Sequence, residues 1–331
     1  MTWSQDVLVT GDVTVNSGVT LTVEPGVTVF FAPNSDDQTS GRWNDLAELI
    51  IWGTLMAEGT ATTPIYFTSA ATQTLPGDWG GIIIRKNSTE SSVKYSLIQY
   101  AETGVGFFTV DEGPGTLSGT VTNSTLRHNA YGLHLYGRPE YSSGGGTVVV
   151  EPLIANNSII SNTQGIVLRT TSGYGTAQNY ATVQNNILRD NETGIYIRGN
   201  TWWLGHADNY PEIVNNTFID NTTYNLDIVA SGSSDGSGAD SDVRPTVENN
   251  LFDSDTLTTT PHIRLYLDPN YSAGVKILNP IIRYNTLRRS TTGILVEDDG
   301  SYDTLNPTIS HNVLYGFDAG ALAIDNQTGR T

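Results

Sequence analysis

The chain of 331 residues contains no cysteine, which excludes a disulfide framework and any thiolate metal site. It also lacks an apolar run of about 18 residues, the length that a transmembrane helix needs. The first residues, MTWSQDVLV, have neither the basic nor the apolar segment of a secretory signal. Acidic, cysteine-free β-repeat proteins usually act outside the cell. We therefore expect that a signal was removed and that the protein is extracellular or lies at the cell surface.

Charged residues, and basic residues above all, are scarce. Charged side chains make up 15% of the sequence, and 16 lysines and arginines stand against 34 aspartates and glutamates, giving a net charge of −18. This surface would repel nucleic acid and anionic membranes, so both are excluded as partners. Glycine, asparagine, threonine and tyrosine are abundant instead, a composition that is typical of short strands joined by tight turns.

A polar residue recurs at one position of a repeat along most of the chain. Successive members lie 28, 33, 29, 30, 34, 35 and 27 residues apart, and they are Ser96, Ser124, Asn157, Asn186, Asn216, Asn250, Asn285 and Asn312. Eight residues after most of them stands a glycine followed by an apolar residue, as in Gly194-Ile195, whereas Asn225 and His262 take the glycine's place in two repeats. A period in this range indicates a solenoid, in which each repeat buries its apolar face against its neighbours.

Each repeat from Val93 onward contains three strand-like segments bounded by turn residues. The first segment ends at the polar position, the second is short, and the third has the pattern Gly-Ile-x-Ile, after which comes a loop of variable length such as 169–181 or 198–210. The sequence therefore predicts an all-β fold, a single-stranded right-handed parallel β-helix (solenoid) with three strands per coil and roughly nine to ten coils. We expect one domain over residues 1–331, with polar excursions in the amino-terminal coils 1–92 and regular coils over 93–331.

The recurring asparagine has a structural explanation. Its amide can hydrogen-bond from coil to coil, and asparagine tolerates the left-handed conformation that a tight turn requires. A solenoid end needs a cap, so we expect the natural chain to be longer than this sequence.

The repeat N-N-x-I/L followed by G-I-x-I, over about residues 93–324, resembles the pectate-lyase-like right-handed β-helix superfamily. Within that superfamily it is similar to the carbohydrate-binding and sugar-hydrolysis repeat of bacterial surface and secreted proteins. The segments SGVTLTVEPGVTV, LIIWGTLMAEGT and GDWGGIII resemble the start of large bacterial surface β-helix proteins. The resemblance implies the fold, whereas its members include lyases, hydrolases, epimerases, adhesins and binding modules. The complete catalytic signatures of polygalacturonases and pectate lyases are absent, and the epimerase motif Asp-Pro-His-Asp is approached only by Asp268-Pro269-Asn270-Tyr271.

Residues two and four positions after each glycine are expected to point outward from the third strand, because side chains alternate along a strand. The two outward rows are His134, Val167, Tyr196, Asp227, Arg264 and Leu295, and Tyr136, Arg169, Arg198, Val229, Tyr266 and Glu297. Aromatic faces beside guanidinium and carboxylate groups suit a sugar chain. The ligand-binding candidates are Tyr136, Arg169, Tyr196, Arg198, Trp202, Trp203, Tyr210, Arg264 and Tyr266. The alternative is that these residues only stabilise exposed sheet and that one of the two tryptophans is buried under its loop.

Catalysis on a polysaccharide would need an acid, a base and a cation near one bond. The candidates are Arg198, His206, Asp208, Tyr210 and Arg264, which could meet in one cleft across three coils; scattered solvated side chains are the other interpretation. No cofactor is required, but flexible acidic turns would suit calcium, with Asp235, Asp240, Asp242, Asp298 and Asp299 as candidate ligands.

Three functions are compatible with these features. The leading hypothesis is an extracellular module that binds polysaccharide or a cell-surface partner without catalysis. The second is a polysaccharide lyase or glycoside hydrolase that acts along one face of the helix. The third is a structural stalk or adhesin repeat.

Overall fold

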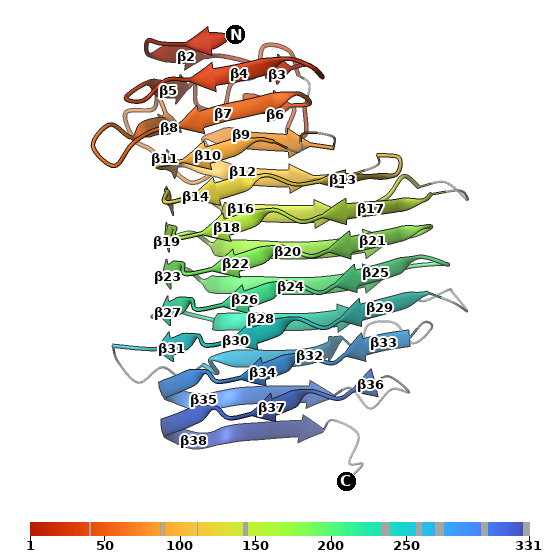
Figure 1. Ribbon diagram of the computed structural model, residues 1–331. Helices are drawn as coiled ribbons and strands as arrows, with labels where there is room; N and C mark the ends of the chain where they lie inside the picture. Colours follow the sequence, from red (N-terminus) through yellow and green to blue (C-terminus); the bar gives the residue numbers. More distant parts are fainter. Residues whose placement is uncertain are drawn as a thin grey trace.

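The computed structural model confirms the predicted fold class, a right-handed parallel β-helix of about nine turns (Figure 1). The structure describes residues 1–39, 41–86, 88, 90–110, 112–141, 145–232, 239–255, 260–268, 275–298 and 304–326. These residues contain no α-helix, and their strands form three sheets of eleven, twenty and seven strands. This part of the chain contains no helix that is long and apolar enough to cross a membrane.

The first sheet stacks the strand that precedes each recurring polar residue. Its strands are β1 (Thr2–Trp3), β4 (Thr20–Val23), β7 (Thr54–Glu58), β10 (Ser92–Lys94), β14 (Thr120–Thr122), β18 (Leu153–Ala155), β22 (Thr182–Gln184), β26 (Glu212–Val214), β30 (Thr246–Glu248), β34 (Ile281–Arg283) and β37 (Thr308–Ser310). Each strand pairs in parallel with its counterpart one coil further on, as Val183 does with Ile213.

The second sheet bends around a corner and contains two stacks. The short strands are β2 (Val7–Val9), β5 (Thr28–Phe31), β8 (Ile65–Ser69), β11 (Ser96–Gln99), β15 (Thr125–Arg127), β19 (Ser158–Ile160), β23 (Ile187–Arg189), β27 (Thr217–Ile219) and β31 (Leu251–Asp253). The stack of the Gly-Ile-x-Ile pattern, whose members we call the long strands, contains β3 (Val13–Val15), β6 (Glu48–Ile51), β9 (Trp79–Arg85), β12 (Ala101–Phe108), β16 (Tyr131–Gly137), β20 (Gln164–Ser172), β24 (Thr193–Thr201), β28 (Tyr224–Ser231) and β32 (Ile263–Asp268). In the last two coils both parts join in β35 (Thr286–Asp298) and β38 (Val313–Asn326).

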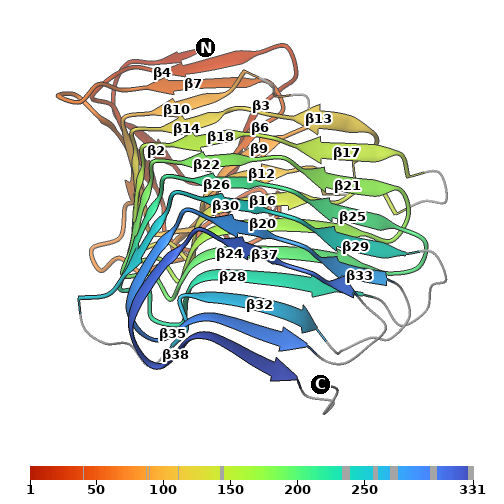
Figure 2. The ribbon, with the colours of Figure 1, turned by 60° about the horizontal axis from the view of Figure 1, so that its bottom comes forward.

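The third sheet lies where the sequence predicted only loops. It contains β13 (Gly115–Leu117), β17 (Thr147–Val150), β21 (Thr176–Asn179), β25 (His206–Asn209), β29 (Asp240–Val243), β33 (Val275–Leu278) and β36 (Thr304–Leu305). The long strand runs beyond the core, turns at a tip, and returns as a strand of this sheet, which extends to one side in Figure 2. The predicted loop 169–181 is therefore mostly strand, because polar threonines and serines pair well in the middle of a stack even without an apolar pattern.

The core is a set of apolar columns that run along the helix. In the short strands, Leu188, Phe218 and Phe252 lie in register, and the two phenylalanine rings stack with centroids 4.5 Å apart. One continuous cluster of buried side chains extends from Trp3 to Val296.

The recurring polar residues form the predicted ladder. Asn186, for example, donates its two Nδ2 hydrogens to Oδ1 of Asn216 (3.0 Å) and to the carbonyl oxygen of Ile154 (3.0 Å), and its backbone N–H also donates to Oδ1 of Asn216 (2.9 Å). The expectation that the ladder residue itself is left-handed is wrong. The positive φ belongs to the residue before it, such as Asn185 (φ 56°) or Asn215 (φ 58°). That exposed residue makes the corner, which leaves the ladder side chain free to point inward.

A second ladder, which the repeat did not reveal, stands at the corner between the short and long strands. Asn129, Asn162, Asn191 and Asn221 are linked in succession, each donating an Nδ2 hydrogen to Oδ1 of the next at 2.9–3.0 Å. The ladder continues through Asn225 into His262, which replaces glycine in the repeat and whose Nδ1 lies 2.6 Å from Asn225 Nδ2. The two exceptions to the glycine pattern therefore extend this ladder.

Candidate functional site

The outward side of the long strands, which we call the long-strand face, carries both rows expected from the sequence. The register aligns His134, Val167 and Tyr196 in one column and Tyr136, Arg169 and Arg198 in the other. The columns continue toward the amino terminus through Ile83 and Arg85 of β9. The face thus reaches over nearly the whole stack.

In the carboxy-terminal half of this face, the charged side chains are already paired. Arg264 makes a bidentate ion pair with Asp227 (2.8 and 2.7 Å), and its guanidinium lies over the rings of Tyr224 (4.5 Å) and Tyr266 (4.8 Å). Burial alone would lower the pKa of Arg264, but the hydrogen bonds to Asp227 raise it, so this arginine stays charged. Arg198 donates to Ser231 Oγ (3.1 Å) and pairs with Asp268 (3.3 Å). The result is a rigid polar surface with aromatic rings between the charges.

The remaining catalytic candidates lie on another face. His206 and Asp208 are on β25 and Tyr210 follows it, all on the outer side of the third sheet. A Cβ atom on Gly199 of β24 would lie 2.6 Å from Ser241 Oγ of β29, so the inner sides of the long strands and the third sheet face each other. Their outer sides therefore point in opposite directions. The single cleft expected for these residues and Arg198 is not formed.

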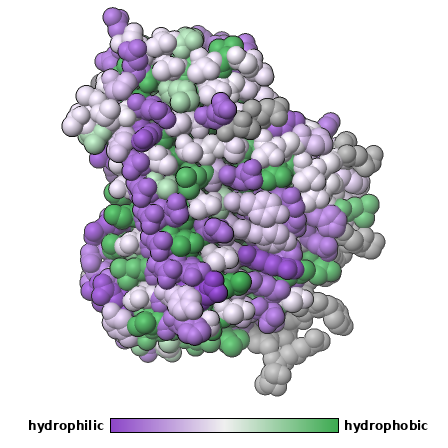
Figure 3. Space-filling view, in the orientation of Figure 1, coloured by the Kyte–Doolittle hydropathy of each residue, from purple (hydrophilic) through white to green (hydrophobic). Residues whose placement is uncertain are grey.

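On the third sheet these candidates contact their own neighbours. His206 Nδ1 lies 3.3 Å from Asp240, Gln178 donates to Asp208 (3.0 Å), and the Tyr210 hydroxyl donates to Asp242 (2.8 Å). Figure 3 shows the side of the molecule with the first and third sheets, where hydrophilic residues run down the stack and apolar residues are scattered.

The candidate calcium ligands are dispersed. Asp235 and Asp299 lie outside the described residues, and Asp298 ends β35. Asp242 accepts a hydrogen bond from Arg244 Nε (2.6 Å) as well as that from Tyr210. Within the described ranges, no group of three or more histidines, cysteines, aspartates or glutamates could hold a metal ion.

Exposed rings gather at the tips where the long strands turn into the third sheet. Tyr141, Tyr174 and Trp203 come from three successive coils, and their ring centroids lie 5.6 to 6.0 Å apart; we call these three residues the rim cluster. Tyr141 is 55% exposed and Trp203 44% exposed. Trp202 is half-buried and packs over Gly173, so neither tryptophan is fully buried. Trp203 has φ 68°, an uncommon backbone conformation for a bulky residue.

A cleft of about 440 Å³ lies at the amino-terminal end of the long-strand face. Its lining includes Arg42, Glu48, Trp52 and Arg85, and we call it the amino-terminal cleft. The sequence did not reveal this cleft, because the polar excursions expected in coils 1–92 gave no sign that Arg42 and Trp43 fold back against Glu48 on the outward side of β6. The one available signal was Glu48, a carboxylate in the otherwise apolar strand ELII.

Glu48 is fully buried in this cleft. Burial raises the pKa of its carboxyl to about 7, although the backbone N–H groups of Trp43 and Arg42 donate to it and oppose that shift. Further along the face, burial lowers the pKa of His134 to about 3, helped by the positive charges of Arg42 and Arg169, so this histidine is neutral.

Comparison with known sequences agrees with this architecture. Residues 144–330, more than half of the chain, match the family described as right handed beta helix region. The chain belongs to the right-handed β-helix family. Residues 1–106 of this β-helix also match the family described as pectate-lyase like beta helix domain. No curated protein matches the chain. Among solved structures, the β-helix is similar to the periplasmic alginate epimerase AlgG, with 11% identity, a TM-score of 0.38, and coverage of 92% of this chain and 78% of that chain.

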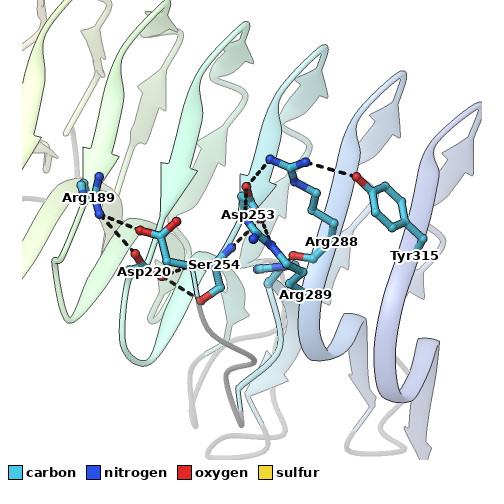
Figure 4. Close-up of polar contacts among 9 residues, drawn as sticks. Arg189, Asp220, Asp253, Ser254, Arg288, Arg289 and Tyr315 are labelled. Carbon is cyan, nitrogen blue, oxygen red and sulfur yellow. Dashed lines mark hydrogen bonds and ion pairs between the residues drawn. The ribbon is translucent and has the colours of Figure 1, made fainter.

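The β-helix also carries a charge cluster that serves the stack itself (Figure 4). Asp253, at the end of β31, accepts hydrogen bonds from Arg288 (2.5 Å) and Arg289 (2.8 and 2.7 Å), and Arg288 also donates to the Tyr315 hydroxyl (3.3 Å). Burial opposes ionisation of Asp253, but the two arginines outweigh it and lower the pKa of the carboxyl. The cluster joins three successive coils and is a structural feature.

Proposed function

We propose that this β-helix binds polysaccharide outside the cell, without catalysis. The observation that carries the proposal is the rim cluster, in which Tyr141 and Trp203 expose their rings at the tips of successive coils. Flat apolar rings with polar edges suit the faces of sugar units, and the three rings, which come from successive coils and pack edge to face, form one compact aromatic patch. Trp203 keeps a strained φ without being buried, a combination that favours a binding role over a packing role.

The long-strand face would add polar contacts beside the rings. Arg169 on β20 donates to Thr171, which lies two residues before Gly173 in the same tip. Rigid, preformed side chains such as the Asp227–Arg264 pair lose little entropy when a ligand binds.

Catalysis is not part of the proposal. Arg198 and Arg264 of the long-strand face are held in ion pairs, and His206, Asp208 and Tyr210 lie on the opposite side of the sheet pair. An acid and a base on the two sides of one scissile bond would have to come from one face.

Affinity electrophoresis through gels that contain neutral or acidic polysaccharides tests the proposal. At least one polysaccharide should retard the wild-type protein, and Trp203→Ala or Tyr141→Ala should weaken that binding roughly tenfold, the equivalent of about 1.4 kcal/mol. Tyr284→Ala is the matched control, because Tyr284 is similarly exposed (49%) but lies after β34 of the first sheet. Retardation that survives Trp203→Ala unchanged, or no retardation by any polysaccharide, would contradict the proposal.

A further inference from the structure

The amino-terminal cleft is lined by a carboxyl group, one oxygen of which has no hydrogen-bond partner among the described residues. Oε2 of Glu48 accepts the backbone N–H groups of Arg42 (2.5 Å) and Trp43 (3.1 Å), whereas Oε1 is buried and makes no hydrogen bond with any residue that the structure describes. Glu48 is 0% exposed and lines the cleft. Buried polar atoms are nearly always satisfied, so Oε1 has one hydrogen-bonding position left for a further partner at the cleft wall.

Two guanidinium groups line the same cleft. Arg85 pairs with Glu112 (2.6 Å) and lies over the ring of Trp52 (5.0 Å). Arg42 lies over Phe108 (4.8 Å) and neighbouring rings, and within the described residues its side chain makes no ion pair or hydrogen bond. The side chain is solvent-accessible, yet the surrounding groups lower its pKa by desolvation. In a protein with a net charge of −18, this local surplus of donors is unusual.

The charged groups around Glu48 come from several segments. Asp12, before β3, accepts the backbone N–H of Glu48 (2.9 Å), and its charge disfavours ionisation of Glu48, whereas the charge of Arg42 favours it. The titratable and charged side chains near Arg42 are Tyr136, Arg85, Arg138, Glu102 and His134, and His134 is neutral. Glu112 is already paired with Arg85.

We propose that the amino-terminal cleft is an oxyanion-binding site, in which Arg42 and Arg85 hold the anion and the protonated Glu48 carboxyl donates a hydrogen bond to it. The ligand class is a carboxylate or sulfate group. In the complex, Oε1 of protonated Glu48 donates its hydrogen to the anion, and the negative charge of the anion pairs with the guanidinium of Arg42. Ionised Glu48 would instead neutralise Arg42 and repel the anion. Binding is therefore coupled to proton uptake at Glu48 and weakens as the pH rises past about 7.

The test uses sulfate and acetate as probes and the arginine side-chain Nε–H resonances of the full chain as the signal. At about pH 5.5, one or both anions should shift the Arg42 and Arg85 resonances saturably, and at about pH 8.5 the dissociation constant should be at least tenfold larger. The two probes distinguish a sulfate-selective from a carboxylate-selective site. Arg42→Gln should abolish the shift of Arg85, whereas Arg283→Gln, a matched change on the first sheet, should leave it intact.

Glu48→Gln isolates the proposed coupling. Its amide keeps a hydrogen-bond donor but cannot ionise, so the dissociation constant should be the same at both pH values. Wild-type protein should also take up a proton on binding near pH 7, measured by calorimetry in two buffers of different ionisation enthalpy, which does not depend on any variant folding. Absence of a saturable shift at about pH 5.5, absence of proton uptake, or an unchanged pH dependence in Glu48→Gln would overturn the proposal.

Discussion

At the scale of single residues, the asparagine ladders explain how polar side chains can occupy the inside corners of a β-helix. An amide carries both a donor and an acceptor, so each asparagine can bind the coil on either side of it. Asn216 accepts from Asn186 and donates to Asn250 Oδ1 (3.1 Å) and to the Val183 carbonyl oxygen (2.8 Å). A serine hydroxyl makes fewer hydrogen bonds than an asparagine amide. Serine occupies the ladder position only at Ser96 and Ser124, in the earliest regular coils.

Removal of one ladder side chain should therefore be costly. Asn216→Ala leaves the buried backbone N–H of Asn186 without its partner and removes the amide's bond to the Val183 carbonyl oxygen, and we expect it to lower the free energy of unfolding by about 3 kcal/mol. Asn215→Gly, at the exposed left-handed neighbour, should change it by less than about 1 kcal/mol. Chemical denaturation measures both, and equal effects would contradict the ladder's role.

The Asp253 cluster makes a prediction about acid. Because its arginine partners lower the pKa of Asp253 below the unfolded value of about 3.9, the ionised carboxylate stabilises the fold above that pH. This stabilisation is lost as the pH falls through the folded pKa. The difference in melting temperature between wild type and Asp253→Asn should therefore shrink from neutral pH toward about pH 3, whereas Asp190→Asn, at an exposed aspartate, should show little difference at any pH. A difference that grows in acid would rule out this account.

At the scale of elements, the glycine of the long strands is needed for close approach between coils. A Cβ atom on Gly165 would lie 2.5 Å from the Gly194 carbonyl oxygen, and the equivalent atom on Gly132 would lie 2.5 Å from that of Gly165. The asparagines of the second ladder hydrogen-bond from coil to coil at the same corner. Sequence alone located this glycine but not the second ladder beside it.

Gly165→Ala should force the coils apart and lower the thermal midpoint, with a cost of about 2–3 kcal/mol. Gly113→Ala is the control, since its Cβ would meet nothing nearer than Lys86 Nζ at 3.7 Å. Thermal unfolding followed by circular dichroism checks the pair. Similar midpoints for the two variants would show that the close approach is unimportant.

At the scale of the whole molecule, the repeat was enough to predict the β-helix because each coil repeats the same inward columns. Position along the strand also fixed which residues point outward, so the rows that contain Tyr196 and Arg264 could be placed in advance. Two features could not be predicted. Strands of the third sheet such as TAQN (β21) and HADN (β25) lack an apolar alternation that would mark them, and the amino-terminal cleft depends on Arg42 and Trp43 folding back against Glu48 of the following strand.

The same limit explains why the catalytic candidates were grouped incorrectly. Arg198 and His206 are eight residues apart in the sequence, but the turn at Trp202 and Trp203 reverses the chain between them and puts their side chains on opposite faces. Separation along the chain gives no information about such a reversal.

Incubation of the best-retained polysaccharide with the protein tests the central claim, binding without catalysis, most directly. Reducing ends and the ultraviolet absorbance of unsaturated sugar ends would be measured over time, with and without calcium. The account predicts that neither rises above the protein-free control while the protein remains bound to the polysaccharide. Product that accumulates in proportion to protein concentration, and disappears in Arg198→Ala with the fold intact, would contradict it.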